Sequence, residues 1–295
     1  MNASRWYVGA MAAAAAVLCA WSIRSTGIEG LVDELTAIGA LLPVVLVCAG
    51  VRFICQAAGW RLAMPEADRP PLAEAFNAVV AGEGAGYFAF GPVSREPVKA
   101  ALVSHRTPQR VALAAAVTER LTYTLAAAVL SVAGLTVIAV RAGAGRGTVA
   151  CALLVAMAAI GIAARRASRA GAIAGLAAAQ ELINLLEAYV VLAWLGADPT
   201  IATVVALEGG SRVLNAAGQF IPGKLGVSEA ASTMLAAGLR LGSGHGLTLA
   251  LARRARSVLW GAAGLLFLTY RTAQPLDFAR GKPAAVRGPA LGYLS

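Results

Sequence analysis

Side chains that carry out catalysis or bind metals are scarce in this chain of 295 residues. Charged residues make up 14% of it, and there are two histidines. His105 and His245 lie near predicted loops, and no HExxH, G-x-S-x-G or Asp-rich metal motif occurs. The sequence therefore lacks the common signatures of metalloproteases, hydrolases and carboxylate metal sites. We therefore expect no enzyme, no catalytic residue, no metal and no cofactor.

Cysteine is also rare. Cys19, Cys48, Cys55 and Cys151 all fall within apolar segments and show no CxxC spacing. A disulfide framework or a zinc site would place cysteines at characteristic short intervals. We interpret these four residues as small buried hydrophobic side chains.

Acidic residues are fewer than basic ones, 15 against 25, which leaves a formal net charge of +10. A protein that binds nucleic acid would gather such charge on one continuous face. Here the arginines punctuate hydrophobic runs instead, which argues against nucleic acid as a partner.

Hydrophobic residues, by contrast, are abundant. They make up 59% of the chain, and the mean hydropathy is +0.71, more than a soluble core of this length requires. A membrane-spanning helix needs about 20 predominantly apolar residues. The sequence therefore predicts an all-α integral membrane protein, a polytopic helix bundle. Six full crossings are expected, at about 6–23, 38–60, 111–140, 148–164, 171–196 and 247–270.

The first of these runs follows Arg5 and has an alternative interpretation as a signal peptide. The sequence Trp21-Ser22-Ile23-Arg24 is a poor small-residue cleavage site, which favours an uncleaved first span. We therefore expect residues 1–270 to form one polytopic membrane domain. Residues 271–295, which include three prolines, are expected to be a loose cytoplasmic tail.

Two further apolar regions, about 72–105 and 201–240, are each cut near the middle by proline and glycine. The breaks read Phe90-Gly91-Pro92-Val93-Ser94-Arg95-Glu96-Pro97-Val98-Lys99 and Phe220-Ile221-Pro222-Gly223-Lys224-Leu225-Gly226-Val227-Ser228-Glu229. Broken backbone within a bilayer persists only where it is buried in protein or lines a wet cavity. We expect each region to form a re-entrant, discontinuous helical hairpin that returns to its side of entry. Both chain termini then share one side of the membrane.

The distribution of basic residues indicates which side that is. With a cytoplasmic N-terminus, the basic residues that fall inside are Arg5, Arg61, Arg69, Arg106, Arg110, Arg165, Arg166, Arg169, Arg271, Arg280, Lys282 and Arg287. Those that fall outside are Arg24, Arg141, Arg146 and Arg240. The positive-inside rule therefore predicts that both termini are cytoplasmic.

Several landmarks recur at an offset of roughly 130 to 134 positions, which suggests an internal repeat of about 38–140 and 171–270. The pairs are Trp60 and Trp194, Phe90 and Phe220, Pro92 and Pro222, Glu96 and Glu229, and Arg120 and Arg254. Three expected crossings separate the two tryptophans, so the copies would point in opposite directions, as in inverted-topology transporters. The alternative is a chance alignment in a chain rich in Ala, Gly and Leu.

Each break offers a site for an anion. Ser94 and Ser228 stand where a half-helix could begin and are candidate N-caps, and Pro97 fits the first turn. A half-helix that begins inside the membrane directs free N–H groups and a positive dipole end into the cavity, which suits a phosphate. Nearby arginine and lysine side chains would add cationic donors to the same anion.

The predicted membrane region also carries many charges. An ionised side chain at a helix centre costs about 2.5–3.5 kcal/mol on insertion scales, so a large set persists only if its members pair or line a polar cavity. Arg52, Arg253 and Arg256 could equally snorkel from helix ends to the interface. The cations that we expect to bind a lipid headgroup are Arg95, Lys99, Arg120, Lys224 and Arg254. A purely structural set of ion pairs is the alternative.

Other residues at the breaks are expected to support these cations. Glu96 and Glu229 would repel a phosphate, so we expect them to orient neighbouring arginines such as Arg120 and Arg254. The full supporting set is Pro92, Ser94, Glu96, Glu119, Pro222, Gly223, Gly226, Ser228 and Glu229. The run Gly82-Glu83-Gly84-Ala85-Gly86 lacks the strand and the Gly-Lys-Ser/Thr of a phosphate loop, which favours close helix packing.

The second break, Ile221 to Glu229, resembles the flippase-like transmembrane region of the lysylphosphatidylglycerol synthase family. That family has a proline, a glycine pair, leucine, glycine, a small residue and glutamate there, and Lys224 replaces the second glycine in this chain. Pro92, Arg95, Glu96 and Lys99 resemble the matching element of the first break. Glu119-Arg120 resembles the charged pair that opens the next helix. The similarity covers about residues 35 to 270.

The resemblance implies a bacterial inner-membrane protein that moves an anionic or modified lipid between leaflets. Some short members of the family accompany hopanoid lipid synthesis. The best-known members add a soluble aminoacyl-transferring domain, which we do not expect in this chain. The expected partner is a membrane lipid, either an anionic phospholipid or an isoprenoid-type lipid.

Three hypotheses about function follow. The first is a flippase-type protein that translocates a lipid headgroup between leaflets. The second is a membrane subunit that presents a lipid acceptor to a separate lipid- or glycan-modifying transferase. The third is a passive scaffold. Nothing in the sequence resembles an ATP site, so a flippase of this kind would depend on a gradient, a partner or the concentration difference of the lipid.

Overall fold

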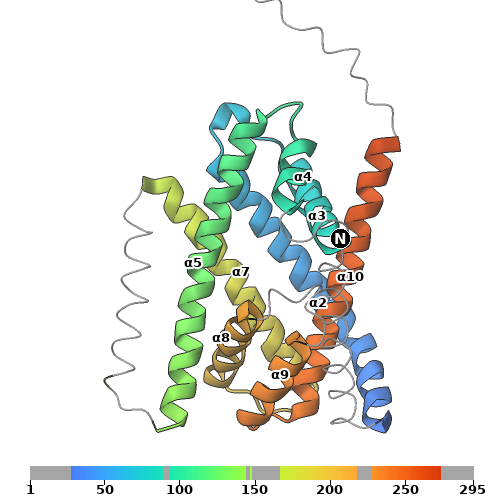
Figure 1. Ribbon diagram of the computed structural model, residues 1–295, viewed down its shortest axis with the longest axis vertical. Coiled ribbons are helices and arrows are strands. Elements are labelled where there is room, and N and C mark those ends of the chain that lie inside the picture. Colours follow the sequence, from blue (N-terminus) through green and yellow to red (C-terminus); the bar gives the residue numbers. More distant parts are fainter. Residues whose placement is uncertain (1–27, 89–93, 144–146, 148–166, 218–226, 274–295) are drawn as a thin grey trace, which may run out of the picture.

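The computed structural model of the protein describes residues 28–88, 94–143, 147, 167–217 and 227–273 (Figure 1). Within these ranges the chain is helical and contains no strand, which confirms the predicted all-α class. The elements are α2 (Ile28–Ala63), the 3-10 helix η1 (Glu66–Asp68), α3 (Leu72–Phe88), α4 (Arg95–Leu102), α5 (Gln109–Arg141), α7 (Ala167–Trp194), α8 (Ile201–Ala217), α9 (Val227–Gly238) and α10 (Ser243–Ala273).

Among the described residues, three helices are long and apolar enough to cross a membrane. These spans are Ile38–Ala63 in α2, Gln109–Arg141 in α5 and Arg169–Trp194 in α7, at the places of three predicted crossings. α10 covers the predicted crossing at 247–270 and has 31 residues, but it carries three arginines near its middle and is not one of these spans. The predicted crossings at 6–23 and 148–164 lie outside the described residues.

Each of the two interrupted regions contains a pair of short helices. α3 has 17 residues and α4 has 8, while α8 has 17 and α9 has 12. All four are shorter than the roughly 20 residues of a typical membrane span. Each pair packs together, α3 against α4 and α8 against α9. Each region therefore contains two helices, as the sequence predicts, while the proline and glycine residues between them lie outside the described residues.

Of the two serines that the sequence predicts as N-caps, Ser94 occupies the N-cap position of α4 without a capping side-chain bond, and Ser228 lies inside α9. α4 begins directly after Ser94, whose backbone is helical, with φ −77° and ψ −16°, and whose side chain makes no capping hydrogen bond. A capping residue normally has a non-helical backbone. α9 begins one residue before Ser228, and the Ser228 hydroxyl donates to the Glu229 carboxylate at 2.8 Å. Pro97 lies in the first turn of α4, as predicted.

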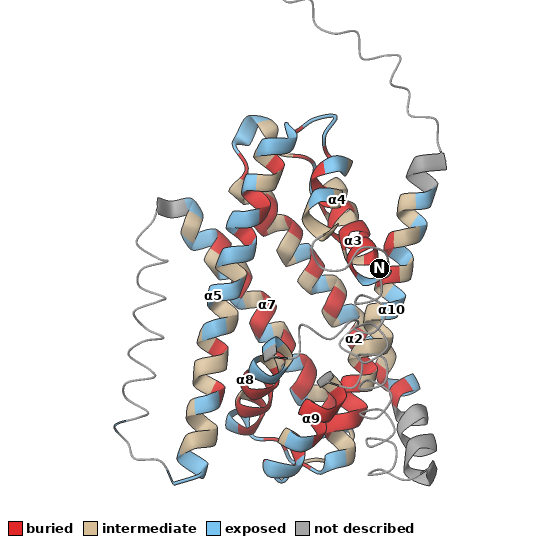
Figure 2. Cartoon of the chain, viewed as in Figure 1, coloured by how far each residue is buried: buried red, intermediate tan, exposed pale blue. Residues whose placement is uncertain are grey.

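The buried side chains form two clusters, one on each half of the bundle (Figure 2). One cluster joins the second half of α2 to α3, α4 and α5, and the other joins the first half of α2 to α7, α8, α9 and α10. Trp60 is fully buried in the first cluster, and its indole N–H donates to the carbonyl oxygen of Ala112 at 3.0 Å. Its predicted repeat partner Trp194 is 66% exposed. The two tryptophans therefore occupy different environments.

Glycines allow two pairs of helices to cross at very short range. A Cβ added at Gly84 on α3 would lie 2.6 Å from the carbonyl oxygen of Gly261 on α10. A Cβ added at Gly134 on α5 would lie 2.6 Å from the carbonyl oxygen of Val205 on α8, and Gly209 packs there against Gly134 itself. Only residues without a Cβ permit such close backbone approach. The glycine-rich run from residue 82 to 86 is thus a packing surface, as predicted.

The helices follow the same order twice, long, short, short, long, first in α2 to α5 and then in α7 to α10. The short helix α3 crosses the long helix α10, and the short helix α8 crosses the long helix α5 in the same way. In both crossings a valine and a glycine four residues apart on the short helix contact the long helix. Val80 and Gly84 precede Val205 and Gly209 by 125 positions. In Figure 1, α5 runs down the view while α10 runs up it, and α2 and α7 also run in opposite directions.

Candidate functional site

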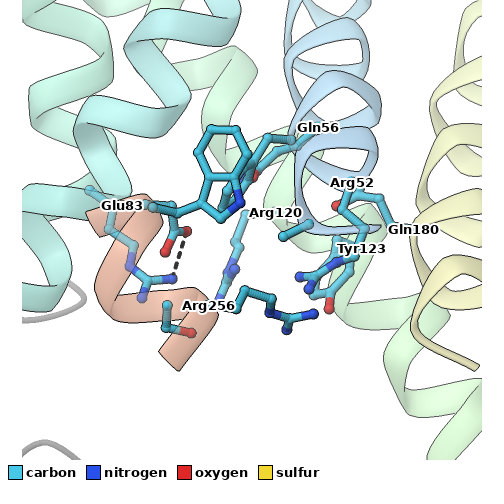
Figure 3. A pocket seen from close by; sticks show the side chains of 12 residues that line it. Arg52, Gln56, Glu83, Arg120, Tyr123, Gln180 and Arg256 are labelled. Atoms are coloured by element: carbon cyan, nitrogen blue, oxygen red, sulfur yellow. Dashed lines mark hydrogen bonds and ion pairs between the residues drawn. The ribbon is translucent and has the colours of Figure 1, made fainter. Parts of the chain in front are cut away.

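We call α2 to α5 the first half of the chain and α7 to α10 the second half. A polar cavity of about 280 Å³ lies where helices of these two halves meet. α2, α3, α4 and α5 contribute from the first half, and α7 and α10 from the second (Figure 3). The lining residues are Ala49, Arg52, Phe53, Gln56, Glu83, Arg95, Arg120, Tyr123, Gln180, Arg256, Ser257 and Trp260. We call this space the cationic cavity.

Helical spacing brings these side chains to the cavity. Arg52 and Gln56 are four residues apart on α2, so they share one face of that helix. Arg120 and Tyr123 are three residues apart on α5 and share a face in the same way. Trp260 also lines the cavity, and its indole N–H donates to the carbonyl oxygen of Leu46 at 3.2 Å. Its ring also contacts the edge of two phenylalanine rings.

Positive charge dominates the cavity, since the lining residues in the described part of the chain include four arginines and one glutamate. Arg95 is bound to that glutamate, with its Nη1 3.0 Å from Glu83 Oε1. Arg256 is paired with the carboxylate of Glu187, which lies behind the cavity wall. Both of these charges are balanced within the protein.

The other two arginines of the cavity form no ion pair with a carboxylate of the described residues. Within the described residues, neither Arg52 nor Arg120 forms an ion pair, and the Nε of Arg52 is buried without a hydrogen bond. The guanidinium of Arg120 lies 5.8 Å from the centre of the Tyr123 ring. Figure 3 shows the guanidinium groups of Arg52, Arg120 and Arg256 directed into the same space. Such a set of donors matches the oxygens of a phosphate or carboxylate.

Neutral polar groups complete the cavity. Gln56 and Gln180 place amide groups at its wall, and Tyr123 places a phenol there. The Tyr123 hydroxyl also lies 3.4 Å from Nη1 of Arg212, which is paired with Glu181 behind it. An anion in the cavity would therefore meet two unpaired guanidinium groups and several neutral hydrogen-bonding groups.

The structure separates the cations that the sequence groups as headgroup contacts. Arg95 and Arg120 lie in the cationic cavity. Lys99 does not, because its side chain is 2% exposed and packs 5.2 Å from the Trp60 ring. Its Nζ lies 2.5 Å from Glu96 Oε2 and 4.0 Å from Glu119 Oε2. This environment favours a structural role for Lys99.

The predicted ion-pair partner is correct for one of the two glutamates at the breaks and wrong for the other. Glu229 is paired with Arg254, as the sequence predicts. Glu96 is paired with Lys99 rather than with Arg120, because both lie on α4 at a spacing of three residues, which brings the side chains together. The remaining predicted site residues, Pro92, Pro222, Gly223, Lys224 and Gly226, lie outside the described residues.

Three arginines for which snorkelling to the interface was an equal alternative point into the bundle. Arg52 and Arg256 line the cationic cavity. Arg253 binds two buried carboxylates, with 2.8 Å from its Nε to Glu187 Oε1 and 2.7 Å from its Nη1 to Glu208 Oε1. Their position well inside α2 and α10 is the sequence signal that they face the bundle, because an arginine reaches the interface by snorkelling only from near a helix end. Within the described residues, no group of His, Cys, Asp and Glu could hold a metal ion.

Comparisons with known proteins add no relative to this description. No family model matches the chain, and neither the search of curated proteins nor the search of solved structures returns a match. The resemblance to the lysylphosphatidylglycerol synthase family therefore stays a prediction from the sequence. The geometry of the cationic cavity is the basis for a functional proposal.

Proposed function

We propose that this chain is a polytopic membrane protein that binds the headgroup of an anionic lipid and moves it between leaflets. The observation that carries the proposal is the cationic cavity, with Arg52 and Arg120 lacking carboxylate partners among the described residues. Unpaired charge at membrane depth is costly, so a ligand of opposite charge is expected there.

The level of the cavity supports this proposal. Arg52 lies 11 residues before the end of the apolar span of α2. Arg120 lies 11 residues after the start of the apolar span of α5, and Gln180 lies 11 residues after the start of the apolar span of α7. These three helix ends lie at the same end of the bundle in Figure 1. At 1.5 Å per residue the cavity lies about 16 Å from that end, close to half of a hydrocarbon core of about 30 Å.

The charges at the two ends support an orientation. Arg61, Arg69, Arg106 and Arg110 lie at the end where α2 finishes and α5 begins, and Arg169 there binds Glu66 at 2.8 Å. The opposite end carries Arg141 and Arg240. By the positive-inside rule this distribution favours a cytoplasmic position for the first end, and we propose a bacterial inner-membrane protein with both chain termini on that side.

We further propose that the two halves are an inverted repeat whose short helices form re-entrant hairpins. The repeated helix order, the matching glycine crossings and the opposite directions of α5 and α10 support this. The cationic cavity is lined from both halves, so rocking of one half against the other would change its access from one leaflet to the other. The family resemblance of the two breaks agrees with a lipid as cargo.

Leaflet exchange in vesicles tests this function. Purified protein should accelerate exchange of a fluorescent anionic lipid, and the double change Arg52→Gln and Arg120→Gln should lower the rate by about tenfold or more, since each change removes charge-assisted hydrogen bonds. Arg110→Gln is the matched control, because Arg110 is exposed on α5 away from the cavity. All three proteins must show the same thermal unfolding midpoint for the comparison to count.

Two results would contradict the proposal. Equal rates of lipid exchange with the double variant and with the control would show that the cavity takes no part in the exchange. Binding of the lipid without any acceleration of exchange would favour the alternative role, in which the protein presents a lipid to a separate transferase.

A further inference from the structure

A second polar cavity, of about 220 Å³, lies beside the cationic cavity. Its lining comes from α3, α8, α9 and α10. Ser257 lines both cavities. Glu83 of the cationic cavity and Tyr87 of the second one lie one turn apart on α3, so the two spaces are neighbours.

The charges of the second cavity are balanced within the protein. Arg253 is bound to Glu187 and Glu208, and Arg254 is paired with Glu229. The cavity therefore differs from the cationic cavity, where two guanidinium groups lack carboxylates. A neutral ligand group fits here better than a second phosphate.

Hydroxyl and amide groups dominate the rest of the lining. Ser211 and Asn215 lie four residues apart on α8, and Ser228 and Ser232 lie four residues apart on α9, so each pair shares a helix face. The Ser228 and Ser257 hydroxyls donate to Glu229 Oε2 and to the carbonyl oxygen of Arg253. Both oxygens can still accept a hydrogen bond from a ligand.

Three further polar groups line this cavity, and one of them is a buried acceptor without a partner. Ser211 and Ser232 are 6% and 8% exposed and turn toward the cavity as lining residues. The Oδ1 of Asn215 is buried and has no hydrogen-bond partner in the described part of the chain. Buried polar groups are nearly always hydrogen-bonded, so the unsatisfied Asn215 oxygen beside these two hydroxyls indicates a ligand or water in the cavity.

We propose that the second cavity binds the hydroxyl groups of a lipid headgroup whose phosphate lies in the cationic cavity. The inference rests on the proposed function and names its substrate class, a phospholipid with a polyol headgroup. A ligand hydroxyl can donate to Asn215 Oδ1 and accept from Ser211 or Ser232. An ammonium headgroup fits poorly, because the carboxylates near the cavity are already bound to Arg253 and Arg254.

Equilibrium binding of two short-chain lipids to the full chain in detergent tests the inference. Dioctanoyl phosphatidylglycerol carries two free hydroxyls, and dioctanoyl phosphatidylpropanol has the same charge and chains without them. The unaltered protein should bind the glycerol lipid about tenfold more tightly. Ser211→Ala with Ser232→Ala should bring the ratio of the two affinities close to one. Ser131→Ala on α5, whose hydroxyl binds the carbonyl oxygen of Ala127, is the control that should keep the ratio.

The outcomes separate the two proposals. Equal affinity of the unaltered protein for both lipids would overturn the hydroxyl site and leave the phosphate cavity standing. Binding of neither lipid would overturn the proposed function itself. Glycerol 3-phosphate binding as tightly as the glycerol lipid would assign the site to a soluble phosphorylated polyol and overturn the lipid assignment.

Discussion

At the scale of single residues, the arginines of the bundle divide by their partners. Arg253 and Arg256 share Glu187, whose side chain is 0% exposed, whereas Arg52 and Arg120 have no carboxylate among the described residues. Buried ion pairs hold a structure together mainly through the penalty for breaking them. The paired arginines therefore serve the fold, and the unpaired ones are available to a ligand.

Replacement of the shared carboxylate should destabilise the protein. Glu187→Gln leaves Arg253 and Arg256 with less compensation for their charge, and removal of one partner from a buried pair costs about 3–5 kcal/mol. The measurement is unfolding in a mixed-detergent titration. Glu66→Gln is the control, because Glu66 is 71% exposed in its pair with Arg169 and such surface pairs are worth about 0–1 kcal/mol. Similar midpoints for both variants would contradict this interpretation.

Lys99 should behave as a structural residue and not as a headgroup contact. Lys99→Met leaves Glu96 and Glu119 without their cation, so the unfolding midpoint should fall. Adding Glu119→Gln removes one of the stranded charges and should restore part of the loss, as coupled residues do in a double-mutant cycle. Unchanged stability together with slower lipid exchange would show that Lys99 binds the ligand after all.

At the scale of elements, the two glycine crossings fix how the short helices pack against the long ones. α3 meets α10 at Gly84 and Gly264, and α8 meets α5 at Gly209 and Gly134. In each case backbone atoms stand where a side chain would be, so neither helix can yield by a rotamer change. These crossings hold each hairpin of one half against a long helix of the other.

Adding a methyl group at either crossing should separate the helices. Gly84→Ala and Gly209→Ala each place a Cβ within 2.6 Å of a backbone oxygen, and overpacking of this kind costs about 1–3 kcal/mol. Gly175→Ala on α7 is the matched control, since nothing lies within 4 Å of its added Cβ, and alanine there should be neutral or stabilising. The measurement is the thermal unfolding midpoint of each variant. Equal changes in the midpoint at all three positions would refute the close packing of the two crossings.

At the scale of the whole molecule, the cationic cavity belongs to neither half alone. Arg120 and Glu83 come from the first half, whereas Gln180 and Arg256 come from the second. A cavity at such a junction changes shape when one half moves against the other. This placement is what links the proposed inverted repeat to the proposed transport of a headgroup.

The opposed ends of the bundle can be tested by labelling. In a version with the four native cysteines replaced by alanine, Ser243→Cys should react with an impermeant maleimide added outside intact cells. Ser104→Cys should react only after the cells are opened. Both serines are exposed, and they lie at opposite ends of the described bundle. Labelling of both positions from the same side would contradict the proposed topology.

The sequence by itself determined the local features of this protein. Long apolar runs identified the helices of α2, α5 and α7, and proline and glycine predicted that each interrupted region contains two helices. Both signals act within one stretch of chain, through burial of backbone polar groups in helices and through the restricted backbone of proline. The pairing of Arg254 with Glu229 also came from the sequence, because α9 and α10 follow one another in the chain and pack together.

Only the tertiary structure decided which charges face the cavity. The sequence grouped Lys99 with the headgroup contacts and left open whether Arg52 and Arg256 reach the interface, whereas packing buries Lys99 and directs the two arginines inward. Glu187 meets Arg253 across 66 positions of sequence, and no local pattern encodes such a partner. Whether a charge is structural or functional depends on what lies opposite it, and that is settled by how the helices pack against one another.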